Sequence, residues 1–592
     1  MEEKRWKIAE PAQASLRESF PELHPVTVQL LANRGITDQK KVDEFLLPDY
    51  GQDLHDPFLF REMEQACARV WTAVARREKV VIHGDYDADG VTGTAILLSV
   101  FREIAGKIGG DAAAITSYIP HREHEGYGLN MAAVEKLAKA GNGLLVTVDC
   151  GISNAAEIAR AHELGMDAIV VDHHQVPERI PECIIIHPLA PGEEYPFKGL
   201  AAAGVAFKFA TAFLDYARRS GVEVPAGREK WLLDLVAIAT VTDFMPLLGE
   251  NRTMEKYGLI VLNKTRRPGL RQLMEAAGLE PGKLDTVSVG YYIGPRINAA
   301  SRMEHADLAL GTVLAESEDE ARELARKLNL CNSERQRQTE ETFKKARGLA
   351  DPAKKVQIVA GDGWPAGIVG IVAGKLVTEL GMPAFALSIQ GDRIVGSGRS
   401  IPEFDVMGLL HAAKGVLARY GGHPEACGLT IEGRQNLREF TRIAEAYAEE
   451  KLAGADLRPA IRVECELELS QVTWELVREL EKFEPFGEGN HRPLFLFRGL
   501  MLNSLCPVGK DGKHVRVGVR GDAPKEFKMI GFGMTERMSE FTPGSAIDAV
   551  AEIGVNHWNG SESIQLRLVD VRAGVEREER EEREKQEETS SR

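Results

Sequence analysis

Carboxylates and imidazoles recur in this chain at the ends of apolar runs, where several of them could act together on a metal ion. Four such places are far apart in the sequence but alike in context. They carry His83, Asp85, Asp87 and Asp89 after KVVI, Asp149 after LLVTV, Asp172, His173 and His174 after AIVV, and Asp243 after LVAIATVT. Because an α/β sheet places functional groups beyond the carboxyl ends of its strands, we expect these side chains to share one edge.

Several buried carboxylates in one place need a counter-charge. Burying each one is costly unless a cation neutralises it, so a metal ion explains the joint pattern better than structural roles do. For Asp149 alone, capping of the following helix is an equally good interpretation. His173 and His174, taken alone, could be ordinary core or surface histidines.

The ligand types narrow the choice of metal. Carboxylates mixed with imidazoles, without thiolates, suit Mn²⁺ or Mg²⁺, with the histidines favouring Mn²⁺ and zinc left open in vitro. Two ions about 3.5–4 Å apart, bridged by one carboxylate, can activate a shared water and hold a phosphate for in-line displacement. The predicted chemistry is phosphoester hydrolysis.

Short β-rich runs alternate with amphipathic helical segments from Lys79 onward. Runs such as KVVIHG, GLLVTVDC and AIVVDHH have the length of buried strands, and their interleaving predicts a mostly parallel, doubly wound sheet. Residues 200–345 are predominantly helical and end in a long polar helix. A second α/β block follows from Val356, and residues 461–571 alternate as a small β-barrel would.

These patterns predict an α/β protein of several domains, because 592 residues exceed what one hydrophobic core supports. The expected domains are an N-terminal helical cap (1–75), a catalytic domain (76–250), a helical connector with a long interdomain helix (251–345), a second α/β domain (346–455), a β-barrel (456–575) and a charged tail (576–592).

Charge and cysteine content limit the class of protein. A net charge of −16 excludes a surface coated in positive charge, so a polyanion would need a local groove and metal ions. The seven cysteines contain no CxxC pair and fit a reducing compartment. The N-terminus lacks the features of a secretory signal, and no apolar run is long enough for a membrane span. We therefore expect a cytoplasmic protein without a membrane partner.

The motifs HGDYDADGVTG, VTVDCGI, VVDHH and VTDFMPL resemble the RecJ family of the DHH phosphoesterase superfamily, and the likeness extends over nearly the whole chain. The resemblance implies a DHH catalytic domain, a DHH-associated domain that binds nucleic acid, and an OB-fold barrel. It also implies two metal ions with Asp149 as the bridge. The implied ligands are His83, Asp87 and Asp149 for one ion, and Asp89, Asp149, His173 and Asp243 for the other.

His174 and Asp85 have no metal in this scheme. His174 stands beside a ligand but points elsewhere, so it is the candidate to contact the scissile phosphate and stabilise developing charge. Asp85 is expected to orient His83, as the outer partners of metal-bound imidazoles do.

Further residues are candidates for holding a strand. Arginines in IGPRINAASRM and IPHREHEGYG could grip phosphates, and a Gly-Gly-His run permits close approach of backbone to phosphate. Ser397 and Arg399 resemble family residues that hold a 5′ terminal phosphate. In the barrel hairpin, ordinary solvated charges are an equal interpretation. The candidates are Arg122, Arg296, Asn298, Arg302, Ser397, Arg399, Gly421, Gly422, His423, Lys513 and Arg516.

The resemblance implies a single-stranded-DNA-specific 5′-to-3′ exonuclease of DNA repair and recombination, acting with a helicase and a single-strand-binding protein. One departure is Trp364-Pro365-Ala366-Gly367, where relatives usually read Trp-His-Pro-Gly, so no contact of that histidine is carried over. Two alternatives remain open: a hydrolase of short oligonucleotides or cyclic dinucleotides, and a catalytically silent nucleic-acid-binding scaffold.

Overall fold

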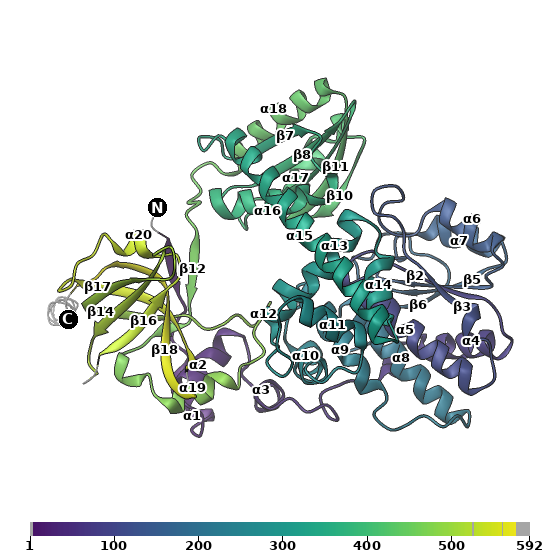
Figure 1. Ribbon diagram of the computed structural model, residues 1–592, viewed down its shortest axis with the longest axis horizontal. Helices are drawn as coiled ribbons and strands as arrows, with labels where there is room; N and C mark the ends of the chain where they lie inside the picture. Colours follow the sequence, from purple (N-terminus) through teal and green to yellow (C-terminus); the bar gives the residue numbers. More distant parts are fainter. Residues whose placement is uncertain (1–3, 524–525, 559, 576–592) are drawn as a thin grey trace. The chain divides into compact units, whose positions relative to one another are not determined.

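The computed structural model describes residues 4–523, 526–558 and 560–575 (Figure 1). The chain divides into two compact units: Met1–Asp49 with Arg458–Arg592 form unit 1, and Tyr50–Leu457 form unit 2. The predicted charged tail (576–592) lies outside the described residues. Within the described residues, no helix has the length and apolar character needed to cross a membrane.

Unit 2 begins with a five-stranded sheet in which all neighbouring strands are parallel. The strands are β2 (Val80–Gly84), β3 (Ile115–Tyr118), β4 (Leu144–Val148), β5 (Asp167–Val171) and β6 (Ile184–Ile186). Their order is β3-β2-β4-β5-β6, so the direction of winding reverses between β2 and β4. A reversal of this kind opens a crevice at the carboxyl ends of the two strands that flank it.

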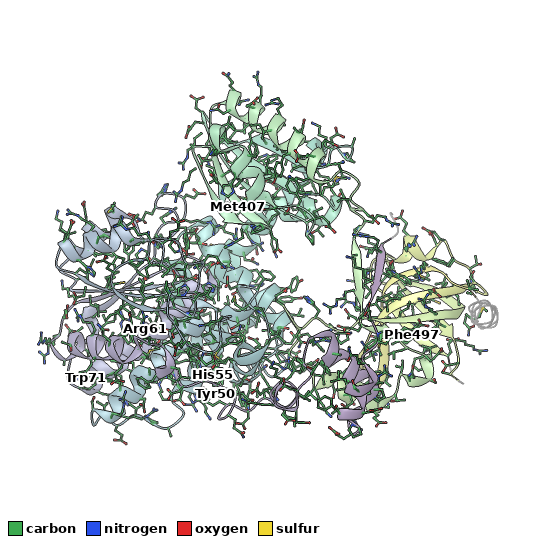
Figure 2. All side chains as sticks on the ribbon, turned by 180° about the vertical axis from the view of Figure 1, so that it is seen from behind. Tyr50, His55, Arg61, Trp71, Met407 and Phe497 are labelled. Carbon is green, nitrogen blue, oxygen red and sulfur yellow. The ribbon has the colours of Figure 1, made fainter. Side chains whose placement is uncertain are left out.

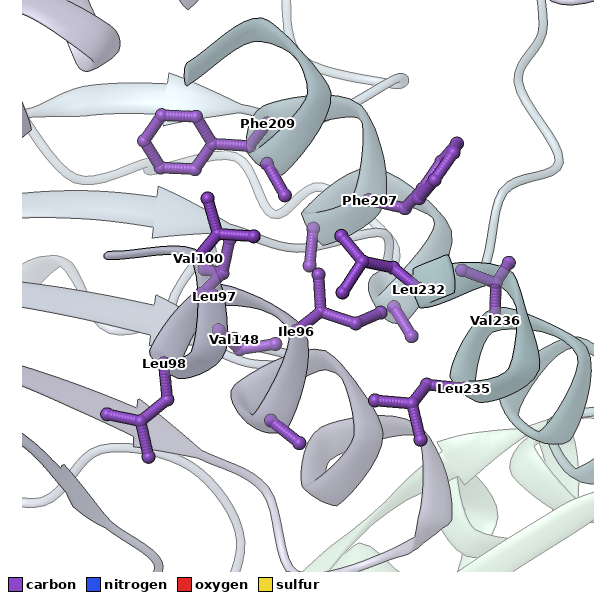
Figure 3. Packing of buried hydrophobic residues seen from close by; sticks show 14 of the residues in the cluster. Ile96, Leu97, Leu98, Val100, Val148, Phe207, Phe209, Leu232, Leu235 and Val236 are labelled. Carbon is purple, nitrogen blue, oxygen red and sulfur yellow. The ribbon is translucent and has the colours of Figure 1, made fainter. Parts of the chain in front are cut away.

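Helices cover both faces of this sheet, which explains why its strands are apolar along their whole length. Figure 3 shows part of the larger core, to which Ile96, Phe207 and Val236 from three different helices and Val148 of β4 all belong. The helices are α4 (Met63–Ala75), α5 (Ala88–Lys107), α8 (Ala202–Arg219) and α9 (Leu233–Thr242) on the larger core, and α6 (Met131–Lys139) and α7 (Ala155–Glu163) on the smaller one.

A helical region follows and ends in the 32-residue helix α15 (Glu318–Leu349), which leads into the second α/β part of unit 2. Ser317 caps this helix by accepting a hydrogen bond from the Glu320 amide, and acidic residues fill its first turn. The region also contains a π-helix, η4 (Val289–Ile293). Its α-helices are α10 (Gly249–Leu262), α11 (Pro268–Ala276), α12 (Thr286–Ser288), α13 (Gly294–Met303) and α14 (Asp307–Leu314).

The second α/β part is a mixed five-stranded sheet with helices against it. Its strands, in spatial order, are β10 (Arg419–His423), β11 (Ala426–Glu432), β9 (Arg393–Arg399), β8 (Ala384–Gln390) and β7 (Gln357–Asp362). Only β7 and β8 are parallel, and the other neighbours are antiparallel. The helices are α16 (Val369–Leu380), α17 (Val406–Ala412), which carries Met407 (Figure 2), and α18 (Arg434–Lys451).

Unit 1 is built around a β-barrel, with Phe497 fully buried inside it (Figure 2). Its strands are β13 (Cys465–Glu466), β14 (Phe495–Val508), β15 (His514–Arg520), β16 (Phe527–Gly531), β17 (Ala546–Trp558) and β18 (Ser561–Ala573). The sheet order is β13-β14-β15-β16-β18-β17, and a further pairing of β14 with β17 closes the barrel. Two short helices, α19 (Trp474–Glu481) and α20 (Thr535–Met538), accompany it.

The N-terminal segment belongs to this barrel unit. Strand β1 (Arg5–Ile8) pairs in parallel with β12 (Ala460–Val463), and the Trp6 indole donates a hydrogen bond to Asp570. Helices α1 (Ala14–Ser19), α2 (Pro25–Asn33) and α3 (Gln39–Leu46) follow β1. The expected cap over 1–75 is therefore divided: residues up to 49 belong to the barrel unit, whereas α4 packs on the parallel sheet of unit 2.

The predicted fold class is confirmed: a doubly wound parallel sheet, a second α/β domain joined by a long helix, and a C-terminal barrel.

Candidate metal centre and nucleic-acid site

The site lies where the sheet order reverses. Asp85 directly follows β2 and Asp149 directly follows β4, and both amides extend the ladder, donating to Val148 and Val171 carbonyls at 3.2 and 3.0 Å. Asp149 has a φ of 62°, which side-chain-bearing residues rarely adopt. The Tyr127 hydroxyl donates to the Asp149 carbonyl at 3.0 Å and helps to hold this conformation. The backbone thus turns the carboxylate into the crevice.

The start of α5 brings in two more carboxylates. Asp87 caps the helix, its Oδ1 accepting from the amides of Asp89 and Gly90 at 3.0 and 3.2 Å. Gly90 is required here, because a Cβ at this position would lie 2.5 Å from the Asp85 carbonyl oxygen. The carboxylate of Asp89 accepts from Ala202 and Ala203 amides at the start of α8, where the helix dipole favours a negative charge.

His173 is the centre of one acidic cluster. Its Nε2 lies 3.4, 3.6 and 3.8 Å from carboxylate oxygens of Asp149, Asp243 and Asp89, distances beyond a normal hydrogen bond. Asp243 reaches this cluster from the C-cap of α9, a helix rather than a strand. Three sets of ligand atoms each lie within 4.8 Å of one another: Asp89, His173 and Asp243; Asp149, His173 and His174; and Asp85, Asp87 and Asp149.

His83 belongs to none of these sets, and Asp85 takes a place beside Asp87 and Asp149. The His83 imidazole is fully buried, stacked against Tyr118 with ring centroids 5.5 Å apart, and its Nε2 has no hydrogen-bond partner.

Burial and mutual repulsion make the cluster unfavourable without cations. Burial, followed by repulsion from the charge of Asp87, raises the pKa of Asp89 to about 7. Burial, followed by repulsion from the charge of Asp89, raises the pKa of Asp243 to about 8. The pKa values of Asp85 and Asp149 are also raised well above normal, by burial and by neighbouring carboxylates. Burial lowers the pKa of His83 and of His173 to about 4, which favours the neutral imidazole that a metal ion binds.

The residues fit divalent cations. Three polar atoms of the site are buried without a hydrogen-bond partner: His83 Nε2, Asp85 Oδ1 and His173 Nε2. Burial of such atoms is unfavourable unless a further group, such as a metal ion, binds them. The nearest thiol is Cys150, whose Sγ lies 3.7 Å from His83 Nδ1 and whose pKa burial raises well above normal. Oxygen and imidazole ligands without a thiolate suit Mn²⁺ or Mg²⁺.

His174 lies between the acidic cluster and Asp172, with its Nδ1 3.8 Å from Asp149 Oδ1. Its Nδ1 lies 2.8 Å from Asp172 Oδ1, and the Tyr127 hydroxyl is 3.1 Å from the same nitrogen. Although burial opposes it, the hydrogen bond with His174 lowers the pKa of Asp172 to about 2. Burial also opposes protonation of His174, but Asp172 raises its pKa. This imidazole is therefore equipped to carry a proton.

A cavity of about 890 Å³ opens beside His174. Residues after β4 and β5 form one wall, and β9, β10 and β11 of the second sheet form the other. The predicted residues Gly421, Gly422 and His423 line it, as does Arg419, which the sequence did not single out.

Arginines gather beside the carboxylates. Burial, together with the charges of Arg122, Arg335 and Arg399, lowers the pKa of Arg302 to about 9. Arg302 donates from Nη1 to the Gly367 carbonyl at 2.8 Å, and the Arg122 guanidinium lies over the Tyr86 ring at 4.7 Å. Mutually repelling, half-buried cations of this kind are suited to bind phosphates.

The other predicted contacts are placed differently. Asn298 Oδ1 accepts from the Ala88 amide at 2.8 Å and so supports α5. Arg296 donates to the Tyr292 carbonyl and to Asn329. Ser397 and Arg399 both lie next to Gly370 of α16. A Cβ added to Gly370 would lie 3.2 Å from Ser397 Oγ and 3.1 Å from Arg399 Nη2.

Lys513 and Arg516 lie in unit 1, on the hairpin between β14 and β15 and on β15 itself. Lys513 pairs with Asp511 at 3.7 Å, both largely exposed, so the structure gives this lysine no special environment.

Besides Arg419, sequence reasoning missed three residues of the site. Tyr127 touches both Asp149 and His174, and its place in IPHREHEGYG, the loop already noted for Arg122, was a usable signal. Arg335 on α15 lies near Arg302 and Arg296, but one arginine in a long charged helix carries no sequence signal. Asp172 was grouped with the histidines but given no role.

Comparisons with known families divide the chain in the same order. The family described as "DHH family, N-terminal domain" matches residues 79–240, the "DHHA1 domain" matches 353–450, and the "RecJ OB domain" matches 463–570. Together with the cation-binding edge of the sheet, these matches define a DHH-type phosphoesterase.

Individual relatives narrow this class. The chain is 35% identical to the single-stranded-DNA-specific exonuclease RecJ of Bacillus subtilis over 96% of this chain and 70% of that protein. It is 33% identical to RecJ of Thermus thermophilus, over 96% and 78%. A crystal structure of RecJ from Thermus thermophilus in complex with Mn²⁺ superposes with a TM-score of 0.81 at 30% identity, covering 96% of this chain and 80% of that one. The chain belongs to the RecJ family.

Proposed function

We propose that this protein is a metal-dependent exonuclease that hydrolyses single-stranded DNA and uses Mn²⁺ or Mg²⁺. The observation that carries the proposal is the cluster around His173, where three carboxylates surround an imidazole nitrogen without a hydrogen-bond partner. Membership of the RecJ family supports the choice of polymer, since its named relatives are single-stranded-DNA-specific exonucleases.

Two divalent cations are part of the proposal. When bound, they supply Lewis acidity that activates water and neutralises the phosphate. The closeness of Asp89, His173 and Asp243 supports one ligand set, and the orphaned Nε2 of His83 supports its role in the other. Asp85 is a further candidate ligand rather than only an orienting partner of His83. The proposed ligands are His83, Asp87 and Asp149 for one cation, and Asp89, Asp149, His173 and Asp243 for the other.

His174 acts on the phosphate in this proposal. Asp172 holds its Nδ1, and the charge of Asp172 favours the protonated form. The opposite nitrogen, which lies 3.4 Å from the Tyr127 hydroxyl, is proposed to contact a phosphate oxygen. A protonated imidazole stabilises charge that develops on the phosphate as the bond to the leaving oxygen breaks.

The second sheet supplies the end preference. Gly421, Gly422 and His423 line the cavity opposite His174. With Ser397 and Arg399, they are proposed to hold a 5′ terminal phosphate, which gives 5′-to-3′ digestion. Arg122, Arg296, Asn298 and Arg302 contribute to the path of the strand. Walls on both sides of the cavity favour one strand over a duplex.

The cellular role is a further part of the proposal. Acting in the cytoplasm in DNA repair and recombination, the enzyme would need a helicase to expose its substrate and would meet a single-strand-binding protein there. All seven cysteines lie in the described part of the chain and are free thiols, which is compatible with a reducing compartment.

Digestion of 5′-labelled and 3′-labelled single-stranded DNA with Mn²⁺, Mg²⁺ or chelator tests polymer, direction and metal together. We expect early release of the 5′ label, dependence on the cation, and little action on blunt duplex. Asp149→Ala should abolish activity, whereas Asp215→Ala, on the exposed side of α8, should not. Early release of the 3′ label would reverse the direction, and activity confined to the shortest oligonucleotides would favour an oligonucleotide hydrolase.

A further inference from the structure

Exposed aromatic side chains in unit 2 are confined to one region. Among residues 50–457, all of which the structure describes, the Phe, Tyr and Trp side chains classed as exposed are Tyr127, Phe244, Tyr291 and Tyr292. The other large exposed hydrophobic residues of this unit are aliphatic. Tyr127 already belongs to the metal centre through its contacts with Asp149 and His174. The remaining three need an explanation.

Phe244 directly follows the carboxylate of Asp243. Its side chain is 76% exposed, and its φ of 54° is one that a bulky residue rarely adopts. An unusual backbone that exposes a phenyl ring beside a functional carboxylate is the kind of strain that accumulates at functional sites.

Tyr291 and Tyr292 lie on the π-helix η4, which packs against the end of α9. A Cβ at Gly290 would lie 3.4 Å from Val241, and one at Gly294 would lie 2.2 Å from Thr242, the last residue of α9. Tyr291 is 75% exposed and Tyr292 44%. π-Helical turns are rare and occur frequently at functional sites.

The segment is held in place from the arginine-rich side. Arg296 donates from Nη1 to the Tyr292 carbonyl at 2.8 Å and from Nε to Asn329 at 3.0 Å, so η4 is tied to α13 and α15. Exposure of the tyrosines therefore does not reflect a loose loop.

We propose that Phe244, Tyr291 and Tyr292, here called the aromatic platform, bind nucleobases of the single strand next to the metal centre. The inference rests on the proposed function and adds a base-binding surface to it. A strand whose phosphates contact the arginines near Arg302 presents its bases to other surfaces. Aromatic rings accept any base by stacking, which suits an exonuclease that must advance without regard to sequence.

Charge supports nucleobases as the occupant. In the cation-free protein, the carboxylates of Asp89, Asp149 and Asp243 at the edge of the sheet beside Phe244 repel a phosphate backbone. Stacking does not depend on charge and attracts the strand where electrostatics does not. A hydrophobic protein partner would fit the same exposure, and the test below distinguishes the two.

The test measures binding of a fluorescent single-stranded oligonucleotide by anisotropy in EDTA, with intact DNA and with a series of DNAs carrying one abasic nucleotide. We expect Phe244→Ala and Tyr291→Ala each to weaken binding by about fivefold to a hundredfold, the usual range for one stacked base. Phe244→Trp should retain binding. Leu164→Ala, an exposed hydrophobic residue that precedes β5 at the opposite edge of the sheet, should bind as the unmodified protein does.

Abasic DNA identifies the stacking partner. One abasic position should weaken binding to the unmodified protein by a similar factor. The same abasic position should lower the affinity of the Phe244→Ala variant only slightly further, because the ring that stacks on that base is already missing. Equal affinity of the variants for intact DNA would overturn the inference and assign the patch to a protein partner. The inference would also be overturned if the variants bind intact DNA more weakly but an abasic position still weakens their binding as much as it weakens binding by the unmodified protein. If the unmodified protein neither binds nor degrades single-stranded DNA, the proposed function itself fails.

Discussion

Replacing Asp172 by Asn should lower both the stability of unit 2 and the activity assigned to His174. The substitution keeps the shape of the side chain but removes its charge. Asp172 accepts hydrogen bonds from the amides of Ile152 and His173 at 3.0 and 2.8 Å and lies 2.8 Å from His174 Nδ1. An amide can satisfy only part of this arrangement, because one of its two positions is a donor.

The pKa of Asp172 gives the magnitude. Its folded pKa of about 2 lies below the ordinary value of 3.8, a difference worth about 2 kcal/mol at 1.36 kcal/mol per pH unit. Because the folded pKa is depressed, this stability is present above pH 4 and is lost as the pH falls through about 2. For a unit of about 400 residues, 2 kcal/mol corresponds to a fall in Tm of roughly 2–3 °C at neutral pH.

Thermal unfolding in EDTA at pH 7 measures this loss, and kcat against pH measures the effect on His174. Without the charge of Asp172 the pKa of His174 falls, so the basic limb of the profile should move to lower pH, with a loss of at least about a hundredfold in kcat at neutral pH. Asp167→Asn is the matched control, because Asp167 begins β5 and is largely exposed beside Arg69. An unchanged Tm and an unchanged pH profile for Asp172→Asn would refute the reasoning.

Three other predictions concern the cluster and its surroundings. The pKa values of Asp89 and Asp243 are raised to about 7 and about 8, so the cation-free protein should lose stability as the pH rises toward 8. Binding of Mn²⁺ should therefore raise Tm more at pH 8.5 than at pH 6, and equal increases in Tm at the two pH values would contradict this. Gly90→Ala should reduce activity at least about a hundredfold, because the added Cβ would meet the Asp85 carbonyl. Gly106→Ala, on the same helix with open space around it, should leave activity unchanged and leave the stability of the protein unchanged or raise it. Arg302→Gln should weaken binding of single-stranded DNA and lower the magnitude of the slope of log K against log salt concentration by about 0.7. Arg322→Gln, at an exposed position, should leave both the affinity and the slope unchanged. An unaltered slope for Arg302→Gln would mean that Arg302 contacts no phosphate.

The catalytic sheet was predictable because local pattern and tertiary structure agree there. Strands buried on both faces leave continuous apolar runs, and the polar residue that ends each run lies at the carboxyl edge. Asp85, Asp149 and Asp172 each follow a predicted strand, so their convergence follows from topology alone. Asp243 was located by the end of its apolar run, although that run is a helix.

Other features depend on contacts that no local pattern encodes. The pairing of β1 with β12 joins residues more than 450 positions apart, and RWKI alone is too short to indicate a strand or its partner. The left-handed backbone of Asp149 and the position of Arg335 beside Arg302 likewise arise only when distant segments meet.

The two charged groups of the site account for how an acidic chain can hold a polyanion. The carboxylates repel one another, as the raised pKa values of Asp89 and Asp243 record, and the arginines repel one another, as the lowered pKa of Arg302 records. Among the described residues no ion pair joins the two groups directly: Arg302 and Arg399 donate to backbone carbonyls, and Asp89 accepts from helix amides. Each group therefore carries charge that an external ion can balance: a divalent cation at the carboxylates and a phosphate at the arginines. A net charge of −16 is compatible with the proposed binding of DNA, since the attraction would come from a few half-buried arginines rather than from the surface as a whole.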